Sequence, residues 1–174
     1  MASKWALQSE ERVFKGGHLN VLRRSFRVGD GPVRDYEILD QGMVVCILAL
    51  TEARACVLVR QFRPGPQRTL TELPAGFIDK GESPADAAVR ELSEETGYTG
   101  ELREVAQLPA NGYSTETRHV FVGTDCVPGV PHPDKGEDLE VVTADLAKLR
   151  ELLRKGDMTV TDAAYVALDS LDLL

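Results

Sequence analysis

Four glutamates and one arginine stand close together at spacings that could support metal-ion chemistry: Glu82, Arg90, Glu91, Glu94 and Glu95. On a helix, positions three and four residues apart lie on the same side, so Glu91, Glu94 and Glu95 would gather their carboxylates. Like charges at this spacing cost roughly a few tenths of a kcal/mol per pair. Arg90 can pair with Glu94, but a single guanidinium cannot neutralise every carboxylate. A hard divalent cation can, because Mg²⁺ and Mn²⁺ prefer all-oxygen sites. On spacing alone, a solvated acidic helix face explains the same residues.

The flanking residues predict the helix that must position these carboxylates. Ser83 is a suitable N-cap, Pro84 suits the first helical position, and Asp86 can reach back to the cap. Gly97 is typical of a helix end. We therefore expect a helix over Pro84 to Thr96, with an apolar stripe packed on a sheet. That stripe comprises Ala85, Ala88, Val89, Leu92 and Thr96.

A longer set of positions resembles the signature of a known family, the Nudix box. Five residues separate Gly76 from Glu82, and seven separate Glu82 from Arg90. So many fixed positions make the motif specific. Tyr98 departs from the family, which usually has an aliphatic residue there. The matching positions are Gly76, Glu82, Arg90, Glu91, Leu92, Glu94, Glu95 and Gly97.

The resemblance implies roles for these residues. Glu91 and Glu95, helped by Glu94, would bind Mg²⁺, with Mn²⁺ as a substitute, and Arg90 would orient the glutamates. Glu82 would be a supporting residue. Such ions bridge a diphosphate, neutralise charge on the phosphoryl oxygens and help to activate a water molecule, so the expected reaction is hydrolysis.

Two segments outside the box resemble the branch of ADP-ribose pyrophosphatases and nucleoside diphosphate sugar hydrolases. They are Gln61-Phe62-Arg63 and Glu72-Leu73-Pro74-Ala75-Gly76. By this resemblance the Ala75 carbonyl would bind a metal ion and Arg63 would contact substrate phosphate, which suits a guanidinium. A surface charge at a strand end is the alternative interpretation of Arg63. Glu37 aligns loosely with a substrate-contacting acid of the branch.

The branch also carries a downstream glutamate on a loop that serves as metal ligand or general base. Residues 136–141 resemble that stretch, which makes Glu137 the candidate. A loop suits such a group because closure positions the base and excludes water. Asp134, Asp138 and Glu140 are close alternatives, and Glu94 is the alternative base.

The resemblance implies metal-dependent hydrolysis of a nucleoside diphosphate sugar, with ADP-ribose cleaved to AMP and ribose 5-phosphate. Residues 109–116 depart from the branch pattern because the proline is displaced, so GDP-mannose or another nucleotide sugar stays as an alternative substrate. A non-catalytic Nudix-like sensor is a further alternative, although such modules tend to lose the glutamates that this chain keeps. A Ser/His/Asp hydrolase is disfavoured, since no serine lies in a nucleophile elbow.

Composition sets the remaining expectations. With 174 residues and 43% hydrophobic residues, the chain can build one globular domain with its own core. A formal charge of −8 argues against nucleic-acid polymers as partners, because phosphate backbones are bound by clustered Lys and Arg. No signal peptide or membrane span is evident, so we expect a cytoplasmic protein. Cys46, Cys56 and Cys126 lack metal-site spacing and are expected to be reduced core residues.

The pattern of elements predicts an α/β protein: a Nudix-type α/β/α sandwich with a mixed central sheet and an N-terminal antiparallel sheet. We expect residues 1–40 to form the antiparallel strands, packed on the core, and residues 41–174 to form the Nudix hydrolase domain. This branch typically exchanges such N-terminal strands between two subunits, so we expect a homodimer. Strands are expected at Arg12–Val28 with a break at Gly16-Gly17, and at Val33–Leu39, Met43–Leu50, Ala55–Arg63, Glu101–Leu108, Arg118–Val127 and Leu139–Val142. A loop is expected at 64–69, no regular strand at 72–79, and helices at Thr143–Lys155 and Thr161–Leu171.

Overall fold

The computed structural model describes residues 4–133, 136 and 138–174. The chain divides into two compact units. One unit comprises Met1–Met43 and Pro109–Thr117, and the other comprises Val44–Leu108 and Arg118–Leu174. Within the described residues, no helix is long and apolar enough to cross a membrane.

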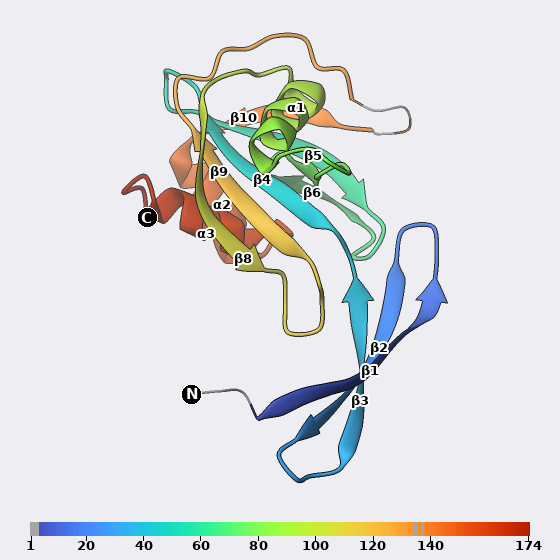
Figure 1. The fold of residues 1–174 in the computed structure, drawn as a ribbon. Helices are drawn as coiled ribbons and strands as arrows, with labels where there is room; N and C mark the ends of the chain where they lie inside the picture. The colour runs from blue at the N-terminus through green and yellow to red at the C-terminus, as the bar shows by residue number, and fades with distance from the viewer. Residues whose placement is uncertain (1–3, 134–135, 137) are drawn as a thin grey trace. The chain divides into compact units, whose positions relative to one another are not determined.

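The first unit contains a three-stranded antiparallel sheet in the order β1-β2-β3 (Figure 1). Its strands are β1 (Trp5–Lys15), β2 (Asn20–Val28) and β3 (Val33–Asp40). The turn after β2 uses Gly29 at a φ of 55°, a conformation that favours glycine. The expected start of the first strand at Arg12 was wrong, because pairing with β2 extends the strand back to Trp5 opposite Val28.

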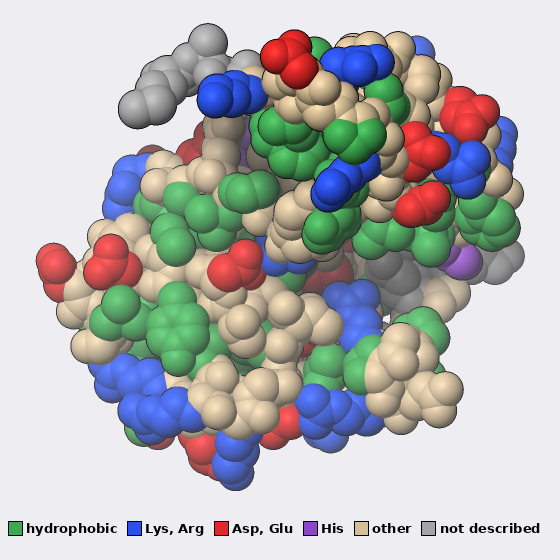
Figure 2. Space-filling model, turned by 90° about the horizontal axis from the view of Figure 1, so that it is seen from below, with side chains coloured by type: hydrophobic (Ala, Val, Ile, Leu, Met, Phe, Trp, Pro, Cys, Tyr) green, Lys and Arg blue, Asp and Glu red, His purple; other side chains and the backbone are tan. Residues whose placement is uncertain are grey.

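Hydrophobic side chains of this sheet reach the surface. Figure 2 shows hydrophobic side chains interspersed with acidic and basic ones on the face that it displays. The exposed large hydrophobic residues of the three strands are Trp5, Leu7, Val13, Phe14, Val28 and Val33. Opposite charges face each other across the strands, and Arg24 Nε donates to Glu10 Oε2 at 2.6 Å. The sheet therefore combines cross-strand ion pairs with an incompletely buried apolar surface.

The second unit is built on a mixed seven-stranded sheet in the order β10-β5-β4-β9-β8, with β6 paired to β5 and β7 paired to β4. The strands are β4 (Met43–Leu50), β5 (Cys56–Arg63), β6 (Arg68–Glu72), β7 (Ala75–Phe77), β8 (Leu102–Pro109), β9 (Thr117–Gly123) and β10 (Glu140–Ala144). The helices are α1 (Pro84–Thr96), α2 (Leu146–Lys155) and α3 (Thr161–Asp169).

Helices cover both faces of this sheet (Figure 1). Successive residues of a strand point to opposite faces, and β4 shows this directly. Val45, Ile47 and Ala49 belong to the apolar cluster that includes Ala87, Ala88 and Leu92 of α1. Cys46, Leu48 and Leu50 belong to the other cluster, with Leu149 and Leu153 of α2 and Ala164 and Leu168 of α3. The predicted α/β/α sandwich is confirmed.

Two strands were missed where turn-forming residues dominate the sequence. β6 begins at Arg68, inside the segment expected to be a loop, and β7 forms at Ala75–Phe77, where no regular strand was expected. β6 forms a hairpin with the neighbouring strand β5, and β7 pairs with β4, which is distant in sequence. Pairing partners, which local propensity does not contain, decided these elements.

Two other boundaries also differ from expectation. β9 ends at Gly123 rather than Val127, and Asp125 follows at a φ of 57°. α2 begins at Leu146 rather than Thr143, because Thr143 and Ala144 complete β10 and the Asp145 side chain caps the helix by accepting from Lys148 N at 2.7 Å.

The three cysteines are free and buried, as predicted. Burial raises the pKa of the Cys56 thiol to about 11 and also raises the pKa of Cys126. Both side chains are therefore protonated at neutral pH and pack as small hydrophobic groups.

Candidate active site

Helix α1 carries the glutamate cluster, and its ends are formed as the sequence predicts. Ser83 Oγ accepts from Asp86 N at 3.1 Å and donates to Asp86 Oδ2 at 2.6 Å. At the other end Gly97 takes the left-handed conformation, with a φ of 75°, and its N–H donates to Ser93 O. These local caps fix both ends of the helix that bears Arg90 and the glutamates.

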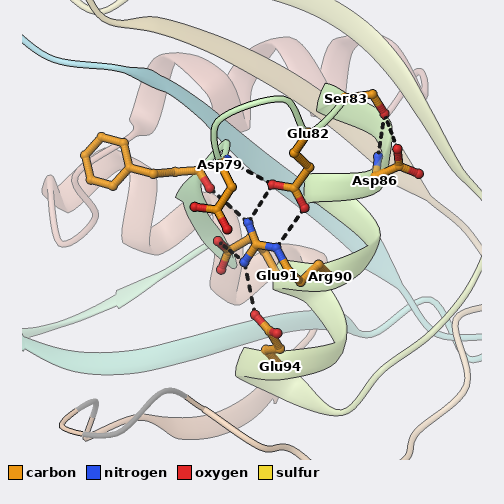
Figure 3. A network of polar contacts seen from close by, with 8 residues as sticks. Asp79, Glu82, Ser83, Asp86, Arg90, Glu91 and Glu94 are labelled. Carbon is orange, nitrogen blue, oxygen red and sulfur yellow. Dashed lines mark hydrogen bonds and ion pairs between the residues drawn. The ribbon is translucent and has the colours of Figure 1, made fainter.

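Arg90 lies at the centre of a polar network (Figure 3). Its Nε and Nη2 donate to the two carboxylate oxygens of Glu82 at 2.8 and 3.0 Å. Nη1 donates to Glu91 Oε1 at 2.8 Å and to Glu94 Oε2 at 3.0 Å, and Nη2 donates to Phe77 O at 3.0 Å. One guanidinium therefore ties three acidic side chains to the loop before the helix, which agrees with an orienting role for Arg90.

The pair of Glu82 and Arg90 keeps both partners charged. Hydrogen bonds from Arg90, and then from the backbone N–H of Asp79, lower the pKa of Glu82 to about 2. The same pair with Glu82 raises the pKa of Arg90 above its usual range, with smaller contributions from Glu91 and Glu94. Glu82 is thus the counter-ion that anchors Arg90.

The short strand β7 lies directly against Glu91 and Glu95 of α1. A Cβ atom on Gly76 would come within 2.0 Å of Glu91 Oε1, so only glycine leaves room for this carboxylate. Next to it, Ala75 N donates to Glu95 Oε2 at 3.0 Å, and Glu95 is only 5% exposed. The backbone at Ala75–Gly76 and the carboxylates of Glu91 and Glu95 therefore share one small region.

The buried face of α1 differs from the predicted stripe. Ala85 and Val89 were expected to pack on the sheet, but both are exposed, Val89 to 51%. The buried residues are Ala87, Ala88, Leu92, Glu95 and Thr96. The buried face includes the Glu95 carboxylate, which accepts from the backbone N–H of Ala75, a contact that an apolar pattern cannot reveal.

The chemistry of this donor set fits a divalent metal ion. Three carboxylates and a neighbouring backbone carbonyl offer only oxygen ligands, which suit Mg²⁺. Within the described residues, no group of three or more acidic, histidine or cysteine side chains is already arranged around a metal position. In this arrangement Arg90 binds one oxygen of Glu91 and one of Glu94.

Arg63 ends β5 and is held by a buried acid that the sequence analysis did not single out. Its Nε donates to Glu72 Oε2 at 2.6 Å, and Glu72 is 1% exposed. The other oxygen of Glu72 accepts from Thr159 N at 3.2 Å and from the Thr159 hydroxyl. Glu72 stands in the segment that suggested the branch, but only tertiary structure reveals these partners.

Glu37 belongs to the first unit. It lies on β3 opposite Arg23 of β2, and Arg23 Nε donates to Glu37 Oε1 at 3.4 Å. Its side chain is exposed. Within this unit Glu37 is therefore one partner of a cross-strand ion pair.

Glu137 and Asp134 lie outside the described residues, and the segments on either side belong to the second unit. Before them, His132 N donates to Glu94 O at 2.9 Å, and a Cβ on Gly129 would come within 2.6 Å of Gly97 O. After them, Glu140 pairs with Arg60 at 2.8 Å. Gly129 and His132 thus lie at the end of α1, and Glu140 lies beside β5.

The chain is similar to known proteins in sequence and in fold. The family model described as NUDIX domain matches residues 40–167, and the chain therefore belongs to the Nudix family, as the box predicted. A solved structure described as an ADP compounds hydrolase superposes with a TM-score of 0.79 at 23% identity, covering 100% of this chain and 99% of that one. At that identity the likeness concerns the fold.

Two relatives of known name indicate the branch of the Nudix family to which the chain belongs. The chain is 30% identical to the ADP-ribose pyrophosphatase of Bacillus subtilis, over 90% of this chain and 87% of the relative. It is 34% identical to the ADP-sugar pyrophosphatase of Mus musculus, over 93% of this chain and 85% of the relative. The protein is thus a Nudix pyrophosphohydrolase of the ADP-ribose pyrophosphatase branch.

Proposed function

We propose that this protein hydrolyses the diphosphate bond of a nucleoside diphosphate sugar in the presence of Mg²⁺, and that its substrate is ADP-ribose, cleaved to AMP and ribose 5-phosphate. The observation that carries the proposal is the cluster of Glu91, Glu94 and Glu95 beside Gly76, in which Arg90 binds Glu91 and Glu94 and the backbone N–H of Ala75 binds Glu95. The activities printed in the names of the bacterial and mouse relatives support the substrate class.

In this proposal, the ion ligands are the Ala75 carbonyl and the carboxylates of Glu91, Glu94 and Glu95. When bound, Mg²⁺ would supply charge neutralisation at the phosphoryl oxygens and lower the pKa of a bound water, with Mn²⁺ as a substitute. Arg90 orients the glutamates, and Gly76 leaves the space in which Glu91 lies. Fixed positions matter because a misplacement of about 1 Å can cost roughly hundredfold in rate.

Two further residues contact the substrate in this proposal. Arg63 binds a phosphate of the diphosphate, and the charge of its guanidinium suits that ligand. Glu37 contacts the nucleotide or sugar as a hydrogen-bond acceptor, and its exposed side chain supports this role.

Glu137 is proposed to be the general base and an additional metal ligand, with Glu94 as the alternative base. The supporting observation is that the chain before Glu137 is hydrogen bonded to the carbonyl of Glu94, on the metal-binding helix itself. A base must lie within hydrogen-bond reach of the attacking water, directly or through one water molecule.

We also propose that the protein is a cytoplasmic homodimer formed through β1–β3. Exposed apolar side chains such as Trp5, Leu7 and Phe14 support association, because apolar surface of this kind is typical of subunit interfaces. Three free buried cysteines suit a reducing compartment. Light scattering coupled to size exclusion tests the dimer, and a monomeric mass at micromolar concentration would contradict it.

The decisive experiment is a substrate panel with product identification. The protein is incubated with ADP-ribose, GDP-mannose and UDP-glucose, in Mg²⁺, in Mn²⁺ and in EDTA. We expect AMP and ribose 5-phosphate from ADP-ribose, only with metal. Glu95→Gln should abolish this activity, whereas the matched variant Glu151→Gln, on the exposed face of α2, should retain it.

Each other outcome has a defined meaning. Cleavage of GDP-mannose alone would refute ADP-ribose as the substrate and keep the reaction class. Binding of a nucleotide sugar without cleavage, in either metal, would refute the catalytic proposal in favour of a sensor. Activity that persists in EDTA would refute the metal requirement.

A further inference from the structure

The buried carboxylate of Glu72 lies beside Arg63. An ionised carboxylate that is 1% exposed is costly unless partners compensate for lost water. Glu72 has partners on both oxygens: Arg63 Nε at Oε2, and the N–H and hydroxyl of Thr159 at Oε1. A group satisfied in this way holds its partners in fixed positions.

The pair with Glu72 engages only one part of the Arg63 guanidinium. Nε donates to Glu72, and among the described residues no protein acceptor is found for Nη1 or Nη2. The Arg63 side chain is 36% exposed, so the group is held at one edge and reaches solvent. The two terminal nitrogens form the edge that binds two oxygens of a phosphate at once.

Thr159, which donates to Glu72, lies in the loop between α2 and α3. This loop runs along β6, since Arg68 of β6 donates to Asp157 Oδ1 at 2.5 Å and to Gly156 O at 3.0 Å. Thr71 N also donates to Asp157 O at 3.4 Å. The loop is thus fastened to β6 at several points, which makes Thr159 a fixed donor to Glu72.

We propose that Glu72 and Thr159 are positioning residues that hold the Arg63 guanidinium with its two terminal nitrogens directed to a diphosphate ligand. The proposal rests on the function proposed above, in which Arg63 contacts the substrate. Neither Glu72 nor Thr159 touches the substrate in this arrangement, and both act through Arg63. The negative charge of Glu72 offsets part of the Arg63 charge, so its contribution is orientation rather than attraction.

Two substitutions remove the support while retaining side-chain size. Glutamine has one acceptor oxygen and one donor NH₂, so in Glu72→Gln it cannot accept both from Arg63 on one side and from the Thr159 N–H on the other. Thr159→Val removes the hydroxyl donor and keeps the backbone N–H. Since Arg63 binds the diphosphate before and during reaction, losing its orientation should raise KM and leave kcat nearly unchanged. We expect KM for ADP-ribose to rise about tenfold in Glu72→Gln and about threefold in Thr159→Val.

Three controls separate positioning from a general loss of structure. Thr159→Ser restores the hydroxyl and should restore KM. Arg118 Nη1 of β9 lies 2.9 Å from Asp162 Oδ1 of α3 in another ion pair. Asp162→Asn removes the charge of that pair and should leave KM unchanged. The third control is a double-mutant cycle in which Glu72→Gln is combined with Arg63→Ala, with melting temperature measured for every variant.

If Glu72 acts through Arg63, Arg63→Ala alone should raise KM more than tenfold, and adding Glu72→Gln should change KM by less than twofold. Additive effects in the cycle, or failure of Thr159→Ser to restore KM, would overturn the positioning role while leaving the proposed hydrolysis in place. An Arg63→Ala variant with unchanged KM would overturn both this inference and the proposed contact of Arg63 with substrate. If the wild-type protein showed no metal-dependent cleavage of a nucleoside diphosphate sugar, the proposed function itself would be refuted.

Discussion

The ion pair between Glu82 and Arg90 offers a quantitative test of the network on α1. Glu82→Gln removes one negative charge and retains the shape of the side chain. The wild-type pair is bidentate, with hydrogen bonds of 2.8 and 3.0 Å, and the side chains of Arg90 and Glu82 are only 28% and 16% exposed. Such a pair should contribute more than an exposed ion pair does.

The magnitude follows from the pKa of Glu82. A decrease from 4.5 to about 2 sets an upper limit of roughly 3 kcal/mol, at about 1.4 kcal/mol per pKa unit. Solvent still reaches both partners, and glutamine can still accept one hydrogen bond. We therefore expect Glu82→Gln to lower the free energy of unfolding by about 1–2 kcal/mol at pH 7.

The sign of the pH dependence is fixed by the direction of this shift. Because the pKa of Glu82 is lower in the folded state, its stabilising effect is complete above the unfolded value of 4.5 and is lost as pH falls toward 2. At pH 3.5 the unfolded carboxyl is mostly protonated and the folded one is not. The difference between wild type and Glu82→Gln should then shrink by about two-fifths or more.

Urea unfolding in EDTA, at pH 7 and pH 3.5, measures this difference. The matched control is Glu151→Gln, since Glu151 also pairs with basic residues, Lys148 and Lys155, but lies on the exposed face of α2. That variant should change stability little. The reasoning would be refuted if the two variants lost equal stability at pH 7, or if the deficit of Glu82→Gln stayed constant on acidification.

Two further predictions concern glycines. Gly76→Ala should lower metal-dependent kcat/KM about hundredfold, because the new methyl group would displace the Glu91 carboxylate. The melting temperature in EDTA should change little, because this carboxylate is flexible and no backbone has to move. Full activity of the variant would show that the position of Glu91 is unimportant. Gly97→Ala should lower the free energy of unfolding by about 2–3 kcal/mol, because Gly97 has a positive φ and a Cβ there would lie 2.7 Å from the backbone at Pro131. Gly156 also has a positive φ, but a Cβ there would meet open space, so Gly156→Ala should cost about 1 kcal/mol. Equal losses in denaturant unfolding would contradict the importance of the Pro131 contact.

Local signals predicted the element that matters most for function. The bounds of α1 agree with the sequence prediction at both ends, because Ser83, Pro84 and Gly97 act through contacts within a few residues of themselves. The pairing of Arg90 with Glu94 was predictable for the same reason, since one helical turn separates them. The strand β4 was predicted by its run of apolar residues, which both faces of the sheet bury.

Contacts between distant segments escaped prediction. β7 exists because β4 offers it a partner, and the buried face of α1 includes Glu95, which bonds to Ala75, 20 residues away. Thr159 reaches Glu72 across 87 residues, so no spacing rule connects them. Each of these features needs a partner whose position is set by the whole fold.

The amino-acid sequence by itself determined the family, the α/β/α layers, the helix of glutamates and the identity of its central arginine. These properties are encoded in local caps, in periodic apolar patterns and in a motif of fixed spacing, all of which act over short stretches of chain. Only the tertiary structure decided which face of α1 is buried, that Gly76 makes room for Glu91, and that Glu72 and Thr159 hold Arg63. The physical reason is that a buried carboxylate requires partners, and folding brings those partners from segments that the sequence keeps far apart.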